Sequence, residues 1–257
     1  MTDENASNYT SHKYRTPDGA PADIVIFTIT TETINRATKS LPKRALKVLL
    51  IKRKLWPYER MWALPGGFSN DRESMYDTAR RELEEETGVN AVHMEYFNVY
   101  SKPGRDPRGW IISHAFFALV HEDSLAERKA SDDAVDVGLF TISELGDSGL
   151  ELAFDHQEVI LDALEQIRSK MLLTSIAKEF LPEEFTLSEL YQVIQTVVPD
   201  FEEANFIRKM KSTQSRSGVL EQVMDAKGEP KKSNEFSQRA AQLYRFAGVM
   251  PKLSLYS

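Results

Sequence analysis

The sequence predicts an α/β domain followed by a smaller domain built from two helices and a β-ribbon. Up to about residue 150, β-branched and aromatic stretches alternate with one amphipathic helical segment. Residues 155–180 then carry apolar residues at helical spacing, and two further helix signals precede two short β-prone segments. We therefore expect a flexible tail at 1–20, an α/β domain at 21–154, a connecting helix at 155–180 and the smaller domain at 181–257.

Several stretches of the first domain have the composition of buried strands. Each is rich in valine, isoleucine or aromatic residues, and proline, glycine and polar residues separate them. The expected strands span residues 22–29, 45–53, 91–101, 109–120 and 134–140.

Helices are marked by their end signals. A helix is predicted over roughly 74–87, because Gly88 lacks a Cβ and suits a left-handed helix end. Thr141 followed by Glu144 has the spacing of a capping box and predicts a second, short helix.

The C-terminal domain has the element order of a winged helix-turn-helix. Thr186 is expected to cap a helix that ends before Pro199, and Asp200 to cap a second helix over 201–213. Segments 217–223 and 240–246 would form the ribbon, with a lysine-rich wing between them.

The composition is that of a globular protein and excludes several functions. Of 257 residues, 41% are hydrophobic and 28% charged, and there is no cysteine. Disulfides, thiolate catalysis and cysteine-ligated zinc are therefore excluded, and a cytoplasmic location is expected. No apolar run reaches the roughly 18 residues of a membrane helix, so we expect no membrane partner.

Charge is distributed unevenly along the chain. Residues 201–257 hold ten Lys or Arg and six acids, a net +4, whereas residues 1–200 hold 22 bases and 33 acids, a net −11. A basic end on an acidic body indicates a nucleic-acid partner, and chance asymmetry is the alternative.

Glutamates gather on one face of the predicted helix. Glu82, Glu85 and Glu86 stand at positions i, i+3 and i+4, beside an apolar stripe. Like charges at this spacing destabilise an isolated helix, and a hard divalent cation would remove the repulsion. The pattern fits a metal site or, alternatively, a solvated acidic face. The stripe consists of Tyr76, Ala79 and Leu83.

The glutamates belong to a longer motif with fixed gaps. Nine positions over residues 67–89 carry the specified residues: Gly67, Glu73, Arg81, Glu82, Leu83, Glu85, Glu86, Gly88 and Val89. This pattern resembles the Nudix box, so the chain is identified as similar to Nudix hydrolases. The resemblance implies an α/β/α sandwich with a mixed sheet.

The same resemblance implies roles for individual residues. Glu82, Glu85 and Glu86, with the backbone carbonyl of Gly66, would hold Mg²⁺ or Mn²⁺. Arg81 and Glu73 would form the ion pair that orients these ligands. The implied catalytic residues are thus Glu73, Arg81, Glu82, Glu85 and Glu86.

The implied reaction is metal-assisted hydrolysis of a nucleoside diphosphate linked to another group. A general base outside the box would take the proton of the attacking water. Each candidate could equally be an ordinary exposed acid. The candidates are Glu122, Asp123, Glu127, Asp132, Asp133 and Asp136.

A second segment narrows the range of substrates to be expected. The loop 101–110 contains Arg105 and Arg108, whose forked guanidinium groups suit phosphates, although it could simply be a polar turn. It resembles the corresponding loop of ADP-ribose-type Nudix proteins and of Nudix-related transcriptional regulators of NAD metabolism. We expect Arg105, Arg108 and Phe68 to bind substrate.

Two functions follow from these resemblances. The first is an ADP-ribose pyrophosphatase that yields AMP and ribose 5-phosphate. The alternative is an ADP-ribose-sensing DNA-binding regulator with little or no hydrolysis. Because every box position is filled, the sequence favours retained hydrolysis.

The C-terminal domain supplies the candidates for DNA binding. The helix over 201–213 would enter the major groove and the wing would reach phosphates; a winged helix kept for dimer contacts is the alternative. The acidic pair Glu202 and Glu203 fits the positive end of the helix dipole and argues against base contacts at the helix start. Operators of this kind usually demand a homodimer. The candidate residues are Asn205, Arg208, Lys209, Lys211, Lys227, Lys231 and Lys232.

We interpret His93, His114 and His156 as structural, and Trp62 and Trp110 as core or pocket wall.

Overall fold

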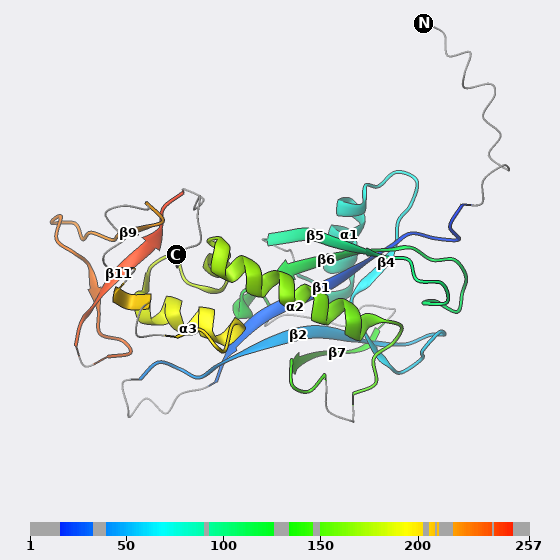
Figure 1. The fold of residues 1–257 in the computed structure, drawn as a ribbon, viewed down its shortest axis with the longest axis horizontal. Helices are drawn as coiled ribbons and strands as arrows, with labels where there is room; N and C mark the ends of the chain where they lie inside the picture. The colour runs from blue at the N-terminus through cyan, green and yellow to red at the C-terminus, as the bar shows by residue number, and fades with distance from the viewer. Residues whose placement is uncertain are drawn as a thin grey trace, which may run out of the picture.

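The computed structural model describes residues 16–32, 40–89, 93–125, 134–145, 150–202, 206–208, 210, 218–237 and 239–248. Most of the expected N-terminal tail and most of the expected second helix of the C-terminal domain lie outside these residues. Figure 1 shows the described elements and their order.

A mixed seven-stranded sheet forms the centre of the first domain. Its main path runs β3-β2-β1-β6-β5, with β4 paired to β1 and β7 paired to β2. The central strand β1 runs parallel to β6 and antiparallel to β2 and β4. The strands are β1 (Pro21–Thr31), β2 (Arg44–Arg53), β3 (Trp62–Ala63), β4 (Gly66–Phe68), β5 (His93–Tyr100), β6 (Ser113–Leu119) and β7 (Ala134–Thr141).

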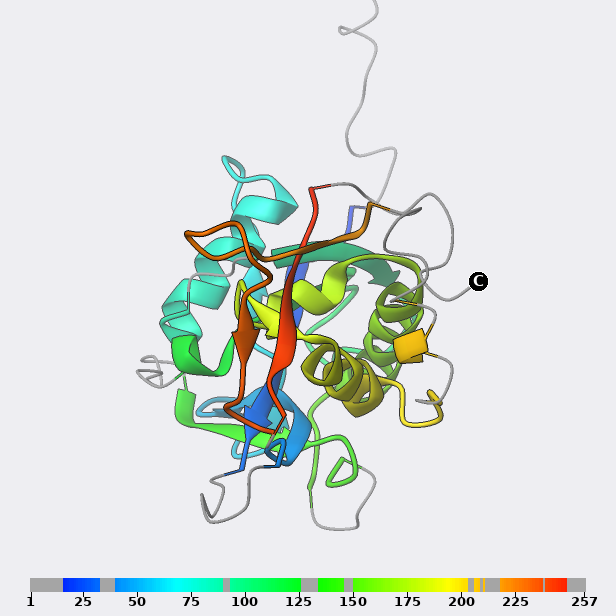
Figure 2. The same cartoon turned by 90° about the vertical axis from the view of Figure 1, so that its left-hand side faces the viewer.

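Helices cover both faces of this sheet. Alternate residues of β1 point to opposite sides, so Ile24 and Ile26 join the core under α1 (Met75–Thr87). Val25 and Phe27 join the core under α2 (His156–Leu173). Because both faces are covered, β1 is apolar along most of its length. The predicted α/β/α sandwich is confirmed. Figure 2 views the molecule from the end of the C-terminal domain, with α1 and α2 on opposite sides.

The ends of α1 lie close to where the sequence placed them. Ser74 caps the helix in a reciprocal capping box with Asp77, and Gly88 closes it with a left-handed φ of 70°. The capping box of Thr141 and Glu144 also forms, but the described residues 142–145 make a turn, and the short helix expected there is absent from them. A local capping signal thus fixes a turn without requiring a helix.

The segment expected as a connecting helix also forms a layer of the sandwich. α2 buries Val159, Ile160, Ala163 and Ile167 against the sheet and is followed by the 3-10 helix η4 (Ile176–Phe180). A second 3-10 helix, η3 (Glu122–Leu125), follows β6. Among the described residues, no helix combines the length and the low polarity needed to cross a membrane.

The C-terminal domain has the expected winged helix. Thr186 caps α3 (Leu187–Val197), as predicted, and it does so in a capping box with Glu189. β11 (Ala241–Phe246) pairs with the other three strands of a small antiparallel sheet. These strands are β8 (Phe185–Thr186), β9 (Leu220–Gln222) and β10 (Lys232–Ser233). Residues 206–208 and 210 are helical.

The two domains share one hydrophobic core. The cluster that begins on β1 continues through α2 into α3 and β11 without interruption. Figure 1 shows α2 and α3 side by side, and α3 packs on both α2 and β2. Polar contacts reinforce the junction: the Arg168 Nε donates to the Val197 carbonyl at 3.2 Å, and the Gln192 side chain donates to the Pro42 carbonyl.

The shared core predicts a single cooperative unfolding transition. Ile160 is fully buried in that core, so Ile160→Ala is expected to lower the free energy of unfolding by about 2–5 kcal/mol. Calorimetry should still show one transition, because the cavity weakens both domains. Leu161→Ala, at the 46% exposed neighbour, should change stability by less than about 0.5 kcal/mol. Two separate transitions in the unmodified protein would contradict the shared core.

Candidate functional site

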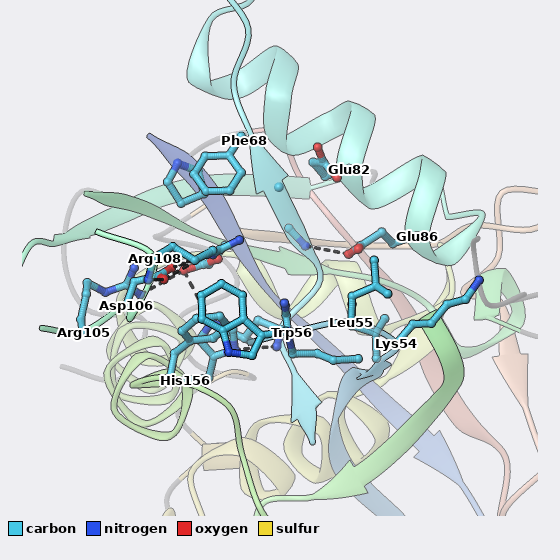
Figure 3. A pocket seen from close by; sticks show the side chains of 18 residues that line it. Lys54, Leu55, Trp56, Phe68, Glu82, Glu86, Arg105, Asp106, Arg108 and His156 are labelled. Carbon is cyan, nitrogen blue, oxygen red and sulfur yellow. Dashed lines mark hydrogen bonds and ion pairs between the residues drawn. The ribbon is translucent and has the colours of Figure 1, made fainter. Parts of the chain in front are cut away.

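A polar pocket opens at the end of the sheet where α1, the loop 101–112 and the start of α2 meet. Its volume is about 340 Å³. Figure 3 shows Glu82 and Glu86 projecting from α1 on one side and the loop arginines on another. The lining consists of Pro21, Asp23, Ile51, Arg53, Lys54, Leu55, Trp56, Leu64, Gly66, Gly67, Phe68, Glu82, Glu86, Arg105, Asp106, Arg108, Phe154 and His156.

The structure separates the three glutamates that were expected to act together. Glu82 and Glu86 are buried and line the pocket, whereas the Glu85 side chain is 58% exposed and lies outside the lining. The Gly66 N–H donates to Glu86 Oε2 at 2.7 Å. The Glu82 carboxylate lies so close to Gly67 that a Cβ at this position would collide with it. Glycine at position 67 therefore leaves room for the Glu82 carboxylate.

Arg81 connects the box residues to one another. Its Nε and one terminal nitrogen donate to the two carboxylate oxygens of Glu73 at 2.8 and 3.0 Å, so the expected ion pair is present. Its other terminal nitrogen donates to Glu82 at 2.5 Å and to Glu85 at 3.1 Å. The hydrogen bonds from Arg81 lower the pKa of Glu73 to about 2, and those to Glu73 raise the pKa of Arg81.

The donor set suits a hard divalent cation. Three carboxylates and a backbone carbonyl are the oxygen ligands that Mg²⁺ and Mn²⁺ prefer. Burial raises the pKa of Glu82 despite the neighbouring Arg81, a cost that a bound cation would remove. Within the described residues, no three acidic or histidine side chains are already gathered around one point. The carboxylates bonded to Arg81 must therefore turn toward an ion to bind it.

The loop 101–112 brings Arg108 into the pocket in a fixed orientation. Its Nε and a terminal nitrogen donate to the carboxylate of Asp106 at 3.0 and 2.6 Å. The guanidinium lies over two aromatic rings, 4.9 Å from the centroid of Phe68 and 5.5 Å from that of Phe154. Arg108 and Phe68, both expected to bind substrate, thus stand together in the pocket wall.

Arg105 is held differently from the expected phosphate ligand. It lines the pocket, but its side chain is only 3% exposed. Its Nε and a terminal nitrogen donate to the two oxygens of Asp155 at 2.8 and 2.6 Å, and the latter nitrogen lies 3.4 Å from Asp23. Because its donors already serve these carboxylates, the geometry favours a positioning role. Substrate binding by Arg105 stays a prediction.

His156 is a buried neutral residue in the pocket wall. The Leu64 N–H donates to its Nδ1 at 2.9 Å, so Nε2 carries the proton and faces Asp23 at 3.8 Å. Burial lowers the pKa of His156 below the ordinary histidine value. The hydrogen bond with Leu64 fits the structural role expected for His156, and the side chain also borders the cavity.

The described general-base candidates lie outside the pocket lining. Glu122 accepts hydrogen bonds from the backbone and side chain of Thr31 at 2.7 and 2.5 Å. Asp123 is largely exposed, and Asp136 bonds to the backbone of Val137. The other candidates, Glu127, Asp132 and Asp133, lie outside the described residues.

Several lining residues were not anticipated from sequence. Asp23 could have been noticed as an acid inside an otherwise apolar strand. Arg53 lies 5.0 Å from the ring centroid of Phe154, whose φ of 54° is unusual for a non-glycine residue. Trp56, at the pocket mouth, has no local signal beyond its apolar size in a polar turn.

The other histidines and tryptophans considered from the sequence lie outside the pocket lining. Trp62 packs on Phe140 at a centroid distance of 4.7 Å, and His93 lies against Glu95 and Phe117. His114 lies beside Tyr96, and Trp110 does not line the pocket.

Only part of the expected DNA-binding set can be placed. Asn205, Lys209 and Lys211 lie outside the described residues, and Arg208 is on a short described helical stretch. Lys227 and Lys232 are exposed on the wing, whereas Lys231 forms an ion pair with Glu184 at 2.5 Å.

Both halves of the chain match known sequence families. The NUDIX domain matches residues 37–163, and the NrtR DNA-binding winged helix domain matches residues 177–246. The chain is 31% identical over 219 residues to the ADPR responsive transcriptional repressor NtrR of Acinetobacter baylyi, an alignment that covers 84% of this chain and 81% of that protein.

Two further relatives match different extents of the chain. It is 42% identical over 116 residues to the ADP-ribose pyrophosphatase of Methanocaldococcus jannaschii, covering 45% of this chain and 64% of that protein. The crystal structure of Shewanella oneidensis NrtR complexed with a 27mer DNA is similar with a TM-score of 0.68 at 26% identity. That alignment covers 91% of this chain and 98% of the other.

The buried His156 predicts a stability loss at mildly acidic pH. Above pH 6.5, the ordinary histidine pKa, both folded and unfolded chains keep it neutral and its contribution is complete. Below that pH only the unfolded chain takes up the proton, so stability falls by up to about 1.4 kcal/mol per pH unit. Urea unfolding between pH 5 and 8 should show a steeper decline for the unmodified protein than for His156→Gln. Equal slopes would contradict the assignment, and His114→Gln serves as the control.

Proposed function

The chain belongs to the Nudix family and ends in the NrtR-type winged helix, and on this premise we propose that it hydrolyses the pyrophosphate of ADP-ribose or of a related nucleoside diphosphate derivative. The products from ADP-ribose would be AMP and ribose 5-phosphate. The observation that carries the proposal is one pocket that brings Glu82 and Glu86 of a complete box together with Arg108. The names of two relatives, a pyrophosphatase and an ADPR responsive repressor, support this substrate class.

Glu82, Glu85 and Glu86, with the Gly66 carbonyl, are the residues that would hold Mg²⁺ or Mn²⁺. When bound, such an ion neutralises pyrophosphate charge and activates a water. Glu82 and Glu85 would have to give up their hydrogen bonds to Arg81 to hold the ion, whereas Glu86 is bonded to the Gly66 N–H. The bidentate bonds to Glu73 would keep Arg81 in place.

Arg108 would bind phosphate oxygens from the opposite wall. Its contact with Asp106 and its position over Phe68 and Phe154 fix the guanidinium before substrate arrives. A preorganised charge of this kind stabilises negative charge at little reorganisation cost. For the general base, the segment 126–133 supplies the remaining candidates, because the described ones do not border the pocket.

We also propose that the winged helix binds DNA and that pocket ligands control this binding. α2 begins at His156, which lines the pocket, and it packs on α3 of the C-terminal domain. A ligand that shifts Arg108 could therefore move α2 through the Arg105–Asp155 pair. A homodimer would match the twofold symmetry usual for operators. Together, the two proposals describe a transcriptional regulator that retains hydrolysis.

Replacement of a pocket glutamate tests the hydrolase. Glu86→Gln keeps the side-chain size but removes the charge, and turnover of ADP-ribose to AMP with Mg²⁺ should fall at least about 100-fold. Glu84→Gln, on the exposed side of the same helix, should retain activity. The measurement is AMP release by chromatography, with melting temperature as the folding check. Equal turnover in both variants would exclude the proposed site, and no turnover by the unmodified protein would exclude the enzyme.

Replacement of a wing lysine tests the DNA interface. Lys232→Ala should weaken binding to DNA from upstream of its own gene and reduce the salt slope of the binding constant by about 1. Fluorescence anisotropy between about 50 and 200 mM salt measures both quantities. Lys43→Ala, an exposed lysine outside the winged helix, should leave the slope unchanged. An unchanged slope in Lys232→Ala would remove this residue from the interface.

A further inference from the structure

We propose that Trp56 binds the nucleobase of the bound nucleotide by stacking its indole on it. The inference rests on the proposed function and adds a subsite to it. Trp56 lies outside the Nudix box. Its exposure, its loop and its place in the pocket each point to a planar ligand.

The first observation is the exposure of the side chain. Trp56 is 69% exposed and its neighbour Leu55 is 61% exposed, the two largest values among the exposed large hydrophobic residues of the described chain. Both border a pocket in which half of the other lining residues are charged. A lone exposed apolar residue is ordinary, but adjacent apolar side chains at the mouth of a binding pocket mark a contact surface.

The second observation is that the loop carrying Trp56 is fixed. The Arg53 N–H donates to the Met61 carbonyl and the Arg60 N–H donates to the Arg53 carbonyl, both at 2.9 Å. The Arg53 Nε donates to the Pro57 carbonyl at 2.7 Å. These bonds close the loop on both sides of the indole.

The same loop holds two residues in an unfavourable backbone conformation. Tyr58 and Arg60 have φ values of 58° and 65°, in the left-handed region that non-glycine residues rarely occupy. The Tyr58 ring packs edge-on against Phe154 at a centroid distance of 4.7 Å, which ties the loop to the pocket wall. Strain of this kind persists where surrounding contacts enforce it, and it concentrates at ligand sites. The indole is thus presented in advance of binding.

The third observation is the position of the indole relative to the charged groups. In Figure 3, Trp56 lies on the side of the pocket away from the α1 helix that carries Glu82 and Glu86. A nucleoside diphosphate derivative has its pyrophosphate between a planar base and a second group. With the pyrophosphate near the glutamates and Arg108, one end reaches toward the mouth. A flat uncharged ring is the end that an indole recognises best.

Substitution of Trp56 tests the proposal by separating binding from turnover. Trp56→Ala should raise the KM for ADP-ribose about 10- to 100-fold and change kcat by less than a few-fold, because stacking contributes to binding of the base. Trp56→Phe should recover most of the affinity, since a ring remains. Trp110→Ala, at a tryptophan outside the pocket lining, is the matched control. A KM for Trp56→Ala within twofold of the unmodified protein would overturn the proposal.

A fluorescence titration identifies the end of the ligand that contacts the indole. The chain has three tryptophans, so Trp62→Phe with Trp110→Phe leaves Trp56 as the sole reporter. AMP should change its emission, whereas ribose 5-phosphate at saturating concentration should not. A change with ribose 5-phosphate alone would place the other end of the ligand there and overturn the proposal.

Calorimetry on the otherwise unmodified chain provides the reference that distinguishes the possible failures. Binding of AMP with equal affinity to Trp56→Ala and to the unmodified protein overturns the stacking proposal while leaving the proposed function intact. Absence of binding by both ADP-ribose and AMP overturns the two together. A change of oligomeric state in Trp56→Ala with unchanged AMP affinity would assign the indole to a contact between copies of the chain.

Discussion

The buried ion pair of Arg105 and Asp155 is the contact on which the rest of the pocket depends. It joins the loop that carries Arg108 to the residue that precedes α2. The flanking residues Phe154 and His156 both border the cavity, so the same short segment builds the wall and starts the helix. Loss of one partner would leave a desolvated charge behind, which is strongly destabilising. The loop and α2 are therefore expected to keep a fixed relation to each other.

The opposite wall has a different electrostatic design. There Arg81 binds Glu73 firmly and shares its remaining donors between Glu82 and Glu85. One cation thus balances several carboxylates, which leaves the wall with excess negative charge. Burial, with a smaller contribution from the neighbouring Glu85 and Glu73, raises the pKa of Glu82. A pocket with acids on one side and arginines on the other suits a ligand whose anionic centre is bridged by a cation to the acids.

Sequence reasoning reached the fold and the box because both depend on local patterns. The capping boxes at Ser74 and Thr186, the left-handed Gly88 and the strand β1 are all decided within a few residues. The exposure of Glu85 and the burial of Arg105 were not reached, because they depend on partners far away in the sequence. Asp155 stands 50 residues from Arg105, and nothing in the loop itself announces that pairing. Likewise, the spacing of apolar residues predicted that α2 is a helix, but it did not predict that this helix forms a layer of the sandwich.

The shared core has a consequence for how such a chain can be rearranged during evolution. A winged helix attached by a flexible tether could be exchanged for another effector by recombination at the tether. Here α3 packs on β2 and α2, and the apolar cluster crosses the boundary near residue 180. A break at that point would expose apolar surface on both fragments, so each fragment would need polar substitutions there to avoid aggregation. The two domains are thus expected to be inherited together.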